Sequence, residues 1–306
     1  MVSRGLHLPI FYDSNLAPST TTKSYDILNT SGQTAQTVTF PFYTNRIDTN
    51  TGEVFVGQSD VNSWYNSLVI VVRRPMRHGL EFSASYTLSK SFDGAQVSGS
   101  NGTFNGTDYP IDPYNRKIEY ALSDLDQRQR FVADEVWMPT FGTGLSKPAK
   151  MVVNGWALST IVTLATGQPV TPYVSGYPSA LDGGVTGGVA YAGATSGRAG
   201  WLPRNGYTGP GLHDVDFRLA RQFPIGERVK LALVGDAFNL FNHTNVVSVN
   251  TTAFNYLAAG ATSGSFSCVG HTNGCYFPNA AFMAPTATSS LLGGSRQLQV
   301  SARLTF

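Results

Sequence analysis

The chain has 306 residues, of which only 13% are charged, and its formal net charge is +2. Soluble domains carry about 25% charged residues, and so small a net charge does not suggest a nucleic-acid partner. With 12% aromatic residues and 32 glycines, the composition fits either a lipid-facing β-barrel with long polar loops or a large secreted β protein.

The first sixty residues give the weakest signals. No apolar stretch follows the basic residue in Met1–Gly5, as a secretory signal would require. Either the chain is not exported or it is the downstream part of a longer protein, and we favour the second. We predict a truncated strand near residues 1–9, and a short strand at 37–42 weakened by Pro41. The remainder of this stretch is interpreted as an extracellular loop.

Three stretches in the first half of the chain have strand character, because side chains alternate between the two faces of a strand. In residues 80–89, one face would carry Leu80, Phe82, Ala84, Tyr86 and Leu88. Residues 64–74 are apolar on both faces at their centre, although Leu68–Val72 is far too short to be a helix that spans a bilayer, which needs about 20 apolar residues. Residues 129–138 place Asp134 beside Glu135, so one acid must face the apolar side.

The second half repeats the alternation at 156–165, 214–219, 229–241 and 296–306. Each stretch is close to the length of about 10 residues with which a tilted strand crosses a bilayer. The last stretch is the most regular and ends on an aromatic residue, as the last strand of a bacterial outer-membrane barrel does. We interpret it as the barrel-assembly strand, whose apolar face carries Val300, Ala302, Leu304 and Phe306.

Short and long connectors alternate strictly along the chain. The short connectors are 74–79, 139–153 and 223–227. The long connectors are about 90–127, 167–212 and 242–295. In a meander, all short turns then lie at one end and all long loops at the other, which is the asymmetry of outer-membrane barrels, with short periplasmic turns and long extracellular loops.

Aromatic residues are expected at both rims of such a wall, because their rings favour the headgroup zone of a membrane. At the short-turn end the sequence places Trp137, Trp156, Phe223 and Phe306. Near the long-loop end it places Trp64, Phe92 and Phe241. The alternative is that these rings form the core of a β-sandwich.

Few residues suggest chemistry. Cys268 and Cys275 lack C-x-x-C spacing, and His271 between them leaves a zinc set incomplete, so a loop disulfide is favoured over a metal or redox pair. His213, beside two aspartates at 214 and 216, is the one cluster that could suggest a hydrolase, but no G-x-S-x-G accompanies it. We interpret it as a polar strand start facing the lumen. Three loop aspartates lack EF-hand spacing; they are Asp112, Asp124 and Asp126. We expect no enzyme, no metal and no cofactor.

Five stretches resemble the C-terminal barrel half of TonB-dependent outer-membrane receptors, in particular the Oar-like branch with a carboxypeptidase-regulatory-like domain. They are LEFSASYTLSKSFD at 80–93, DLDQRQRFV at 124–132, NGWALS at 154–159, DAFNLFNHTN at 236–245 and LTF at 304–306. They follow the order of the family and together cover roughly residues 60–306. The sequence departs from the family at Glu135, where an apolar or aromatic residue is usual.

The resemblance implies a complete protein with a plugged barrel of about 22 strands, coupled through a TonB box to an inner-membrane motor. This chain shows no signal peptide, plug or TonB box and would supply about seven or eight strands. The predicted fold is therefore all-β, an antiparallel transmembrane β-barrel wall that forms an incomplete barrel. Residues 1–60 would hold the truncated strand and an extracellular loop, and residues 61–306 the C-terminal transmembrane portion.

An open sheet cannot sit in lipid alone, because unpaired backbone groups cost several kcal/mol each in hydrocarbon. The expected partners are therefore outer-membrane lipid, the barrel-assembly machinery, a missing N-terminal barrel half with its plug and through it TonB, and an unknown extracellular ligand. The expected function is that of an outer-membrane transport receptor, truncated or split. The alternatives are a secreted soluble β-sandwich adhesin or glycan-binding protein, and a passive porin.

Overall fold

The structure is a computed structural model that describes most of the chain. It describes residues 2–18, 21–43, 45–52, 54–94, 112, 114–142, 144–176, 198–225, 229–289 and 294–306. The loops expected at 90–127, 167–212 and 242–295, and the shorter connectors expected at 139–153 and 223–227, lie partly outside these residues. Within the described part of the chain, no helix has the length and apolar character needed to cross a membrane.

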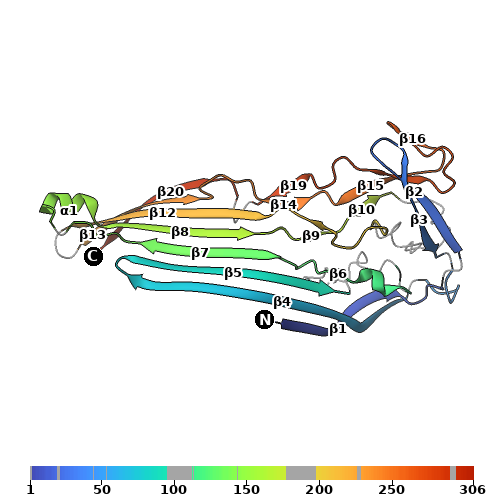
Figure 1. Cartoon of the computed structure of the whole chain (residues 1–306), viewed down its shortest axis with the longest axis horizontal. Helices are drawn as coiled ribbons and strands as arrows, with labels where there is room; N and C mark the ends of the chain where they lie inside the picture. Colours follow the sequence, from blue (N-terminus) through green and yellow to red (C-terminus); the bar gives the residue numbers. More distant parts are fainter. Residues whose placement is uncertain are drawn as a thin grey trace.

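Eight long strands form one continuous antiparallel sheet, in the order β1-β4-β5-β7-β8-β12-β13-β20 (Figure 1). Their bounds are β1 Val2–Asp13, β4 Phe55–Arg77, β5 Leu80–Asp93, β7 Gln129–Trp137, β8 Trp156–Ala165, β12 Leu212–Ile225, β13 Val229–Phe238 and β20 Gln297–Thr305. The short strand β6, Ala121–Leu122, pairs with the last two residues of β5. The predicted meander of about seven or eight strands is confirmed, and these strands make a single sheet rather than the two packed layers of a sandwich.

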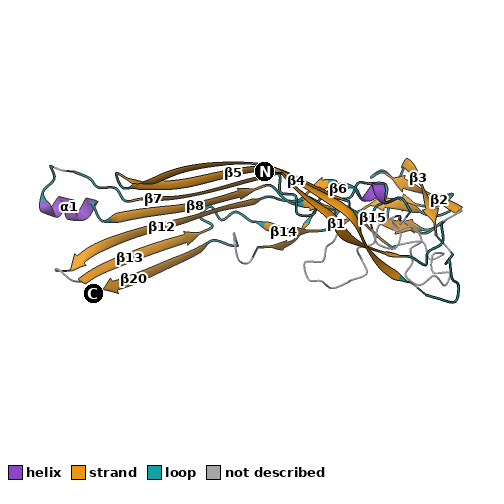
Figure 2. Cartoon of the chain, turned by 90° about the horizontal axis from the view of Figure 1, so that it is seen from below, coloured by secondary structure: helices purple, strands orange, loops and turns teal. Residues whose placement is uncertain are grey.

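The sheet is an open wall. In the described part of the chain its outermost strands are β1 and β20, each with one neighbour in the sheet, and Figure 2 shows β20 at one margin. The strands are also staggered. A row of direct partners runs across the wall from Leu298, near the start of β20, to Arg74, near the short-turn end of β4. Val2, at the start of β1, instead pairs with Asn66, which lies nearer the long-loop end of β4. Progressive stagger of this kind is what tilted barrel strands require.

The register gives the wall one apolar face and one polar face, because direct partners in an antiparallel pair project to the same side. Starting from Leu298, the partners run through Ala237, Phe217, Thr160, Glu135 and Phe82 to Arg74. Nearer the short turns, Leu304 pairs with Leu231, and Leu231 pairs with Phe223. The alternating stretches of separate strands therefore form one surface, which we call the apolar face; the other side is the polar face.

The two ends of the wall differ as the connector lengths predict. At the short-turn end, β4 and β5 are joined by His78-Gly79, both with positive φ as in a type I′ turn. The connector between β7 and β8 contains the seven-residue helix α1, Lys147–Val153. The long connectors all gather at the opposite end (Figure 1).

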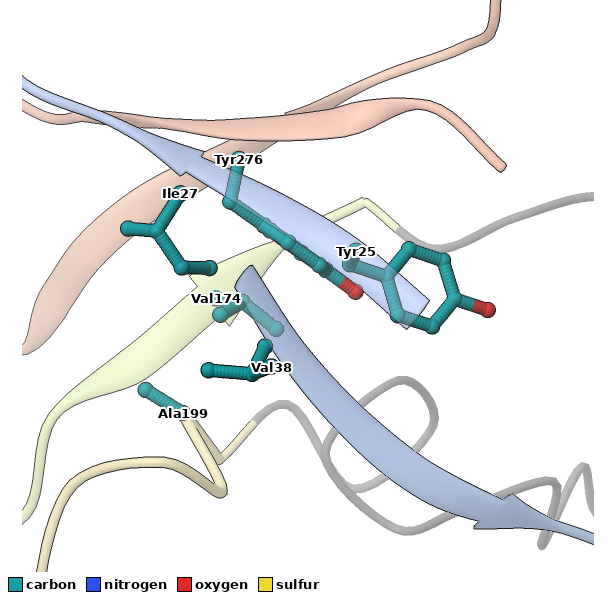
Figure 3. Close-up of a cluster of buried hydrophobic side chains, with 6 residues drawn as sticks. All are labelled: Tyr25, Ile27, Val38, Val174, Ala199 and Tyr276. Atoms are coloured by element: carbon teal, nitrogen blue, oxygen red, sulfur yellow. The ribbon is translucent and has the colours of Figure 1, made fainter. Parts of the chain in front are cut away.

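The long-loop end contains a second sheet with its own core, which we call the loop assembly. Its strand order is β10-β15-β18-β2-β3, with parallel pairing between β10 and β15 and between β18 and β2. The bounds are β2 Thr21–Leu28, β3 Thr34–Phe42, β10 Tyr173–Ser175, β15 Thr252–Leu257 and β18 Cys275–Pro278. Figure 3 shows the buried side chains that meet here: Tyr25, Ile27, Val38, Val174, Ala199 and Tyr276.

Smaller elements complete this end. They are the 3-10 helix η1, Arg116–Glu119, and three ribbons: β9 Pro169–Val170 with β11 Tyr207–Thr208, β14 Val246–Val249 with β19 Pro285–Thr288, and β16 Thr262–Ser263 with β17 Phe266–Ser267. The region expected to be mostly loop before residue 60 holds the regular hairpin β2–β3 and the start of β4. Pro41 is accommodated because β3 is the edge strand of its sheet in the described chain.

The core of the loop assembly yields a prediction with a matched control. Ile27 is 5% exposed within this core, whereas Ile47 is 66% exposed. Ile27→Ala should destabilise the loop assembly by about 2–5 kcal/mol, as large-to-small changes in cores do, and Ile47→Ala should have little effect. Amide hydrogen exchange of β2 and β18 would measure this, and equal effects of the two substitutions would contradict the assignment of the core.

Candidate functional site

The apolar face of the wall is a candidate binding surface. Its side chains are exposed on the last strand, with Val300 at 86% and Phe306 at 95%, and on the opposite part of the wall at Leu68 and Ile70. Soluble monomers rarely expose contiguous apolar patches of this extent, so such a face requires an apolar partner. Ala302 and Leu304 lie on it opposite Leu233 and Leu231.

Aromatic side chains mark both rims of the apolar face. At the short-turn end, Trp137 lies opposite Leu80 and Leu158, and Trp156 lies opposite Arg221. At the long-loop end, Trp64 pairs with Phe92, and the Tyr120 ring contacts both, with centroid distances of 5.5 and 5.6 Å. These positions agree with the rims expected from the sequence.

Glu135 is the acid that the alternation forces onto the apolar face. Its direct partners are Phe82 and Thr160, and the Thr160 hydroxyl donates a long hydrogen bond of 3.5 Å to its carboxylate. Asp134 lies on the polar face opposite Ser83 and Ile161. The departure at Glu135 therefore places an acidic side chain on the apolar face.

The polar face carries an ion pair and a hydrogen-bonded carboxylate. The Arg218 guanidinium donates to the Asp236 carboxylate, with an Nε to Oδ1 distance of 2.5 Å. Asp216 accepts a hydrogen bond of 2.9 Å from the backbone N–H of Asn239. Such groups suit a water-filled lumen, where charges remain hydrated.

The histidine–aspartate cluster considered from the sequence is divided between the two faces. His213 lies opposite Leu164 on the apolar face, whereas Asp214 and Asp216 lie on the polar face. The His213 ring instead contacts the His243 ring at 4.8 Å between centroids. Among the described residues, no three His, Cys, Asp or Glu side chains come together as metal ligands.

Buried ion pairs fasten the long connectors to one another. Arg204 is fully buried and donates to the Asp93 carboxylate and to the Glu119 carbonyl oxygen. Arg198 pairs with the Glu119 carboxylate at 2.5 Å. These residues join the connector after β5 to the connector after β8. The sequence analysis did not identify them.

The three loop aspartates that lack EF-hand spacing all accept hydrogen bonds from protein donors. Asp112 accepts from the Tyr43 hydroxyl at 2.7 Å, Asp124 from the Asn205 amide at 2.5 Å, and Asp126 from the Ser91 backbone N–H at 2.6 Å. The three carboxylates therefore act as separate anchors for loop backbone and side chains.

A hollow of about 620 Å³ opens where the wall meets the loop assembly. It lies between the ends of β8 and β12 and the ribbon strands β9 and β14, and none of its lining residues is charged. Amide side chains reach it from Gln127, Gln168 and Asn245, next to apolar side chains such as Leu212 and Val247. The sequence could not reveal it, because its lining comes from connectors far apart in the chain.

The two cysteines form a disulfide, Cys268–Cys275, which is completely buried beside Leu28. In the same region the His271 ring contacts the Asp26 carboxylate at 2.6 Å. Hydrogen bonds from the Thr37 hydroxyl and from His271 lower the pKa of Asp26. These contacts join β2 and β3 to the segment before β18.

Comparison with known proteins gives one match. The family model described as "Outer membrane beta barrel domain" matches residues 2–299. Neither the search of curated proteins nor the search of solved structures found a match. The match covers the loop assembly and the wall as far as Gln299 of β20.

The Asp26 contacts predict an acid dependence of the loop assembly. Because the folded-state pKa of Asp26 is lowered, its carboxylate stabilises the fold above its unfolded pKa of about 3.9, and this contribution is lost as pH falls through the lower folded value. Hydrogen exchange of β2 and β18 should therefore accelerate as pH falls below about 4, after correction for intrinsic exchange rates. Asp26→Asn should lack this component.

Asp48 provides the control, because its pKa is lowered by contacts with Thr51 and Asn50 within its own turn. Asp48→Asn should leave the acid dependence of β2 and β18 unchanged. Identical pH profiles for the original chain and for Asp26→Asn would contradict the prediction.

Proposed function

The chain belongs to the outer-membrane β-barrel domain family, and from this premise we propose that it forms part of the wall of an outer-membrane transport receptor. More specifically, we propose the C-terminal barrel portion of a TonB-dependent receptor of the Oar-like branch. The protein lies in the outer membrane, so its apolar face contacts lipid, its short turns face the periplasm and its long loops are extracellular.

The observation that carries the proposal is the open wall. Each backbone group left unpaired in hydrocarbon costs several kcal/mol, yet β1 and β20 each have one neighbour within the described chain. We propose that both margins pair with further strands, supplied by an N-terminal barrel half of a longer protein or by a separate subunit.

Closure of these eight strands on themselves is the competing arrangement. The interior of an eight-stranded barrel is filled by side chains, whereas the polar face carries small residues such as Ser83, Ser85 and Thr163. The stagger of the wall also places β1 toward the long-loop end and β20 toward the short-turn end. Both features favour a wall that lines a wider lumen, in which a plug would contact the polar face.

We propose that the loop assembly contacts the extracellular ligand. The disulfide and the buried ion pairs hold the loops in one arrangement, as a recognition surface requires, and the uncharged hollow at its base could accept a neutral group. Coupling to TonB would act through the plug, and the chain's own residues would serve as wall and ligand contact.

The test is expression of residues 1–306 with an added signal peptide in a Gram-negative host, alone and with the proposed N-terminal half. Heat-modifiable migration should appear only when both parts are present. A heat-modifiable monomer formed by this chain alone would overturn the incomplete wall. A large steady single-channel conductance of the assembled protein would favour the passive porin over the receptor.

Two adjacent residues of the last strand test which face meets lipid. Val300 lies on the apolar face opposite Gly235, and Ser301 lies on the polar face opposite Val234. Val300→Lys should reduce the assembled fraction in the outer membrane, because a lysine on the lipid side costs about 2–4 kcal/mol at the midplane and less near the interfaces.

Ser301→Lys is the matched control and should assemble nearly as well as the original protein. Heat-modifiable migration measures the assembled fraction of both variants. If Ser301→Lys were the more damaging substitution, the assignment of the two faces would be wrong.

A further inference from the structure

The helix α1 at the short-turn end is held by side chains of the apolar face. The last carbonyl groups of a helix lack partners within it, and here the Arg221 guanidinium donates to the Met151 carbonyl at 2.6 Å and the Trp156 indole N–H donates to the Val152 carbonyl at 3.2 Å. Trp156 and Arg221 are direct partners on the apolar face. The end of α1 is therefore tied to the lipid-facing side of the wall, at the periplasmic rim (Figure 1).

Arg221 lies between two aromatic rings. Its guanidinium carbon is 4.7 Å from the Trp156 ring centroid and 4.5 Å from the Phe223 ring centroid. Stacking on rings fixes the plane of a guanidinium, whose N–H groups then point outward from its edges. Within the described chain no carboxylate pairs with Arg221, and its Nε is buried without a hydrogen-bond partner.

Apolar side chains project from the same corner. Met151 is 65% exposed and Val152 is 62% exposed, and Phe141 and Leu145 are also exposed on the connector before α1. Exposure of these groups to water is unfavourable, but at the boundary between headgroups and acyl chains the apolar groups can enter the lipid. The corner therefore combines a polar, positively charged part with an apolar part, as a group that anchors a protein at a membrane interface does.

The charge at this corner complements a phosphate group. Lys150 of α1 adds a second positive charge next to the residue whose carbonyl Arg221 binds. The one acid of β7 that shares this face is Glu135, whose partner Thr160 lies further along β8 than Trp156. A positively charged guanidinium held in place by two rings and a carbonyl suits the oxygens of a phosphate, and the neighbouring apolar groups suit a phosphate that is attached to acyl chains.

We propose that the α1 corner, formed by Lys150, Met151, Val152, Trp156 and Arg221, binds the phosphate of a phospholipid headgroup in the periplasmic leaflet of the outer membrane. Arg221 supplies the oriented N–H donors and Lys150 supplies charge. Met151 and Val152 lie among the upper acyl carbons. The bound lipid fixes the height of the wall in the membrane at this rim. The proposal requires only the location in the outer membrane and is independent of coupling to TonB.

The test uses the protein as extracted from the outer membrane in mild detergent, with bound lipid counted by native mass spectrometry. Phosphatidylglycerol should be retained, whereas diacylglycerol, which has the same chains without phosphate, should not. Inorganic phosphate at millimolar concentration should not displace the lipid. Equal retention of diacylglycerol, or displacement by inorganic phosphate alone, would overturn the proposal.

Arg221→Gln should weaken phosphatidylglycerol binding about tenfold or more, since a hydrogen bond between charged groups is lost. Lys230→Gln is the matched control, because Lys230 lies at the same end on the polar face opposite Thr305, and its binding should equal that of the original protein. Equal losses of phosphatidylglycerol binding in both variants would show that only the net charge matters, and would overturn the proposed binding site. Heat-modifiable migration verifies that each variant is assembled, and the comparison of lipids on the original protein decides the question even if Arg221→Gln does not assemble.

Discussion

The register between neighbouring long strands is the constraint on which this structure depends. Side chains alternate along a strand, so a slip of one residue would exchange the two faces. Glu81 and Asp134 would then turn to lipid, and Phe82 would turn into the lumen. The observed register leaves Glu135 on the lipid-facing side, next to Thr160. The location of one face in hydrocarbon therefore depends on every pairing across the wall.

The two ends of the molecule obey opposite rules of burial. The wall keeps its large apolar side chains outside, as Val300 and Leu68 illustrate, and gains stability only where lipid and neighbouring strands cover it. The loop assembly buries its apolar side chains around Tyr276 and adds a disulfide. A buried pair such as Arg198 with Glu119 contributes less to net stability than to a unique arrangement of the loops, since desolvation offsets its attraction.

The sequence predicted the wall well because its signals are local. A period of two within 80–89 or 296–306 identifies a strand and its faces without knowledge of its neighbours, and the alternation of short and long connectors then places the two ends. Before residue 60 the same reasoning predicted a strand near residues 1–9 and a short strand at 37–42, where the structure has β1 and β3, but it interpreted β2 as part of a loop. Pro41 weakened the signal of β3, and the edge position of β3 makes the proline harmless.

The sequence by itself determined an antiparallel wall with one apolar face, because the alternation of apolar and polar residues involves only neighbours along the chain. Tertiary structure alone decided how the loops fold together. Asp26 meets His271 across 245 residues, β2 lies parallel to β18, and the hollow forms between distant connectors. The same holds for the α1 corner, where Arg221 reaches a carbonyl 70 residues away. Such contacts depend on which segments the wall brings together in space, and no local periodicity encodes that choice.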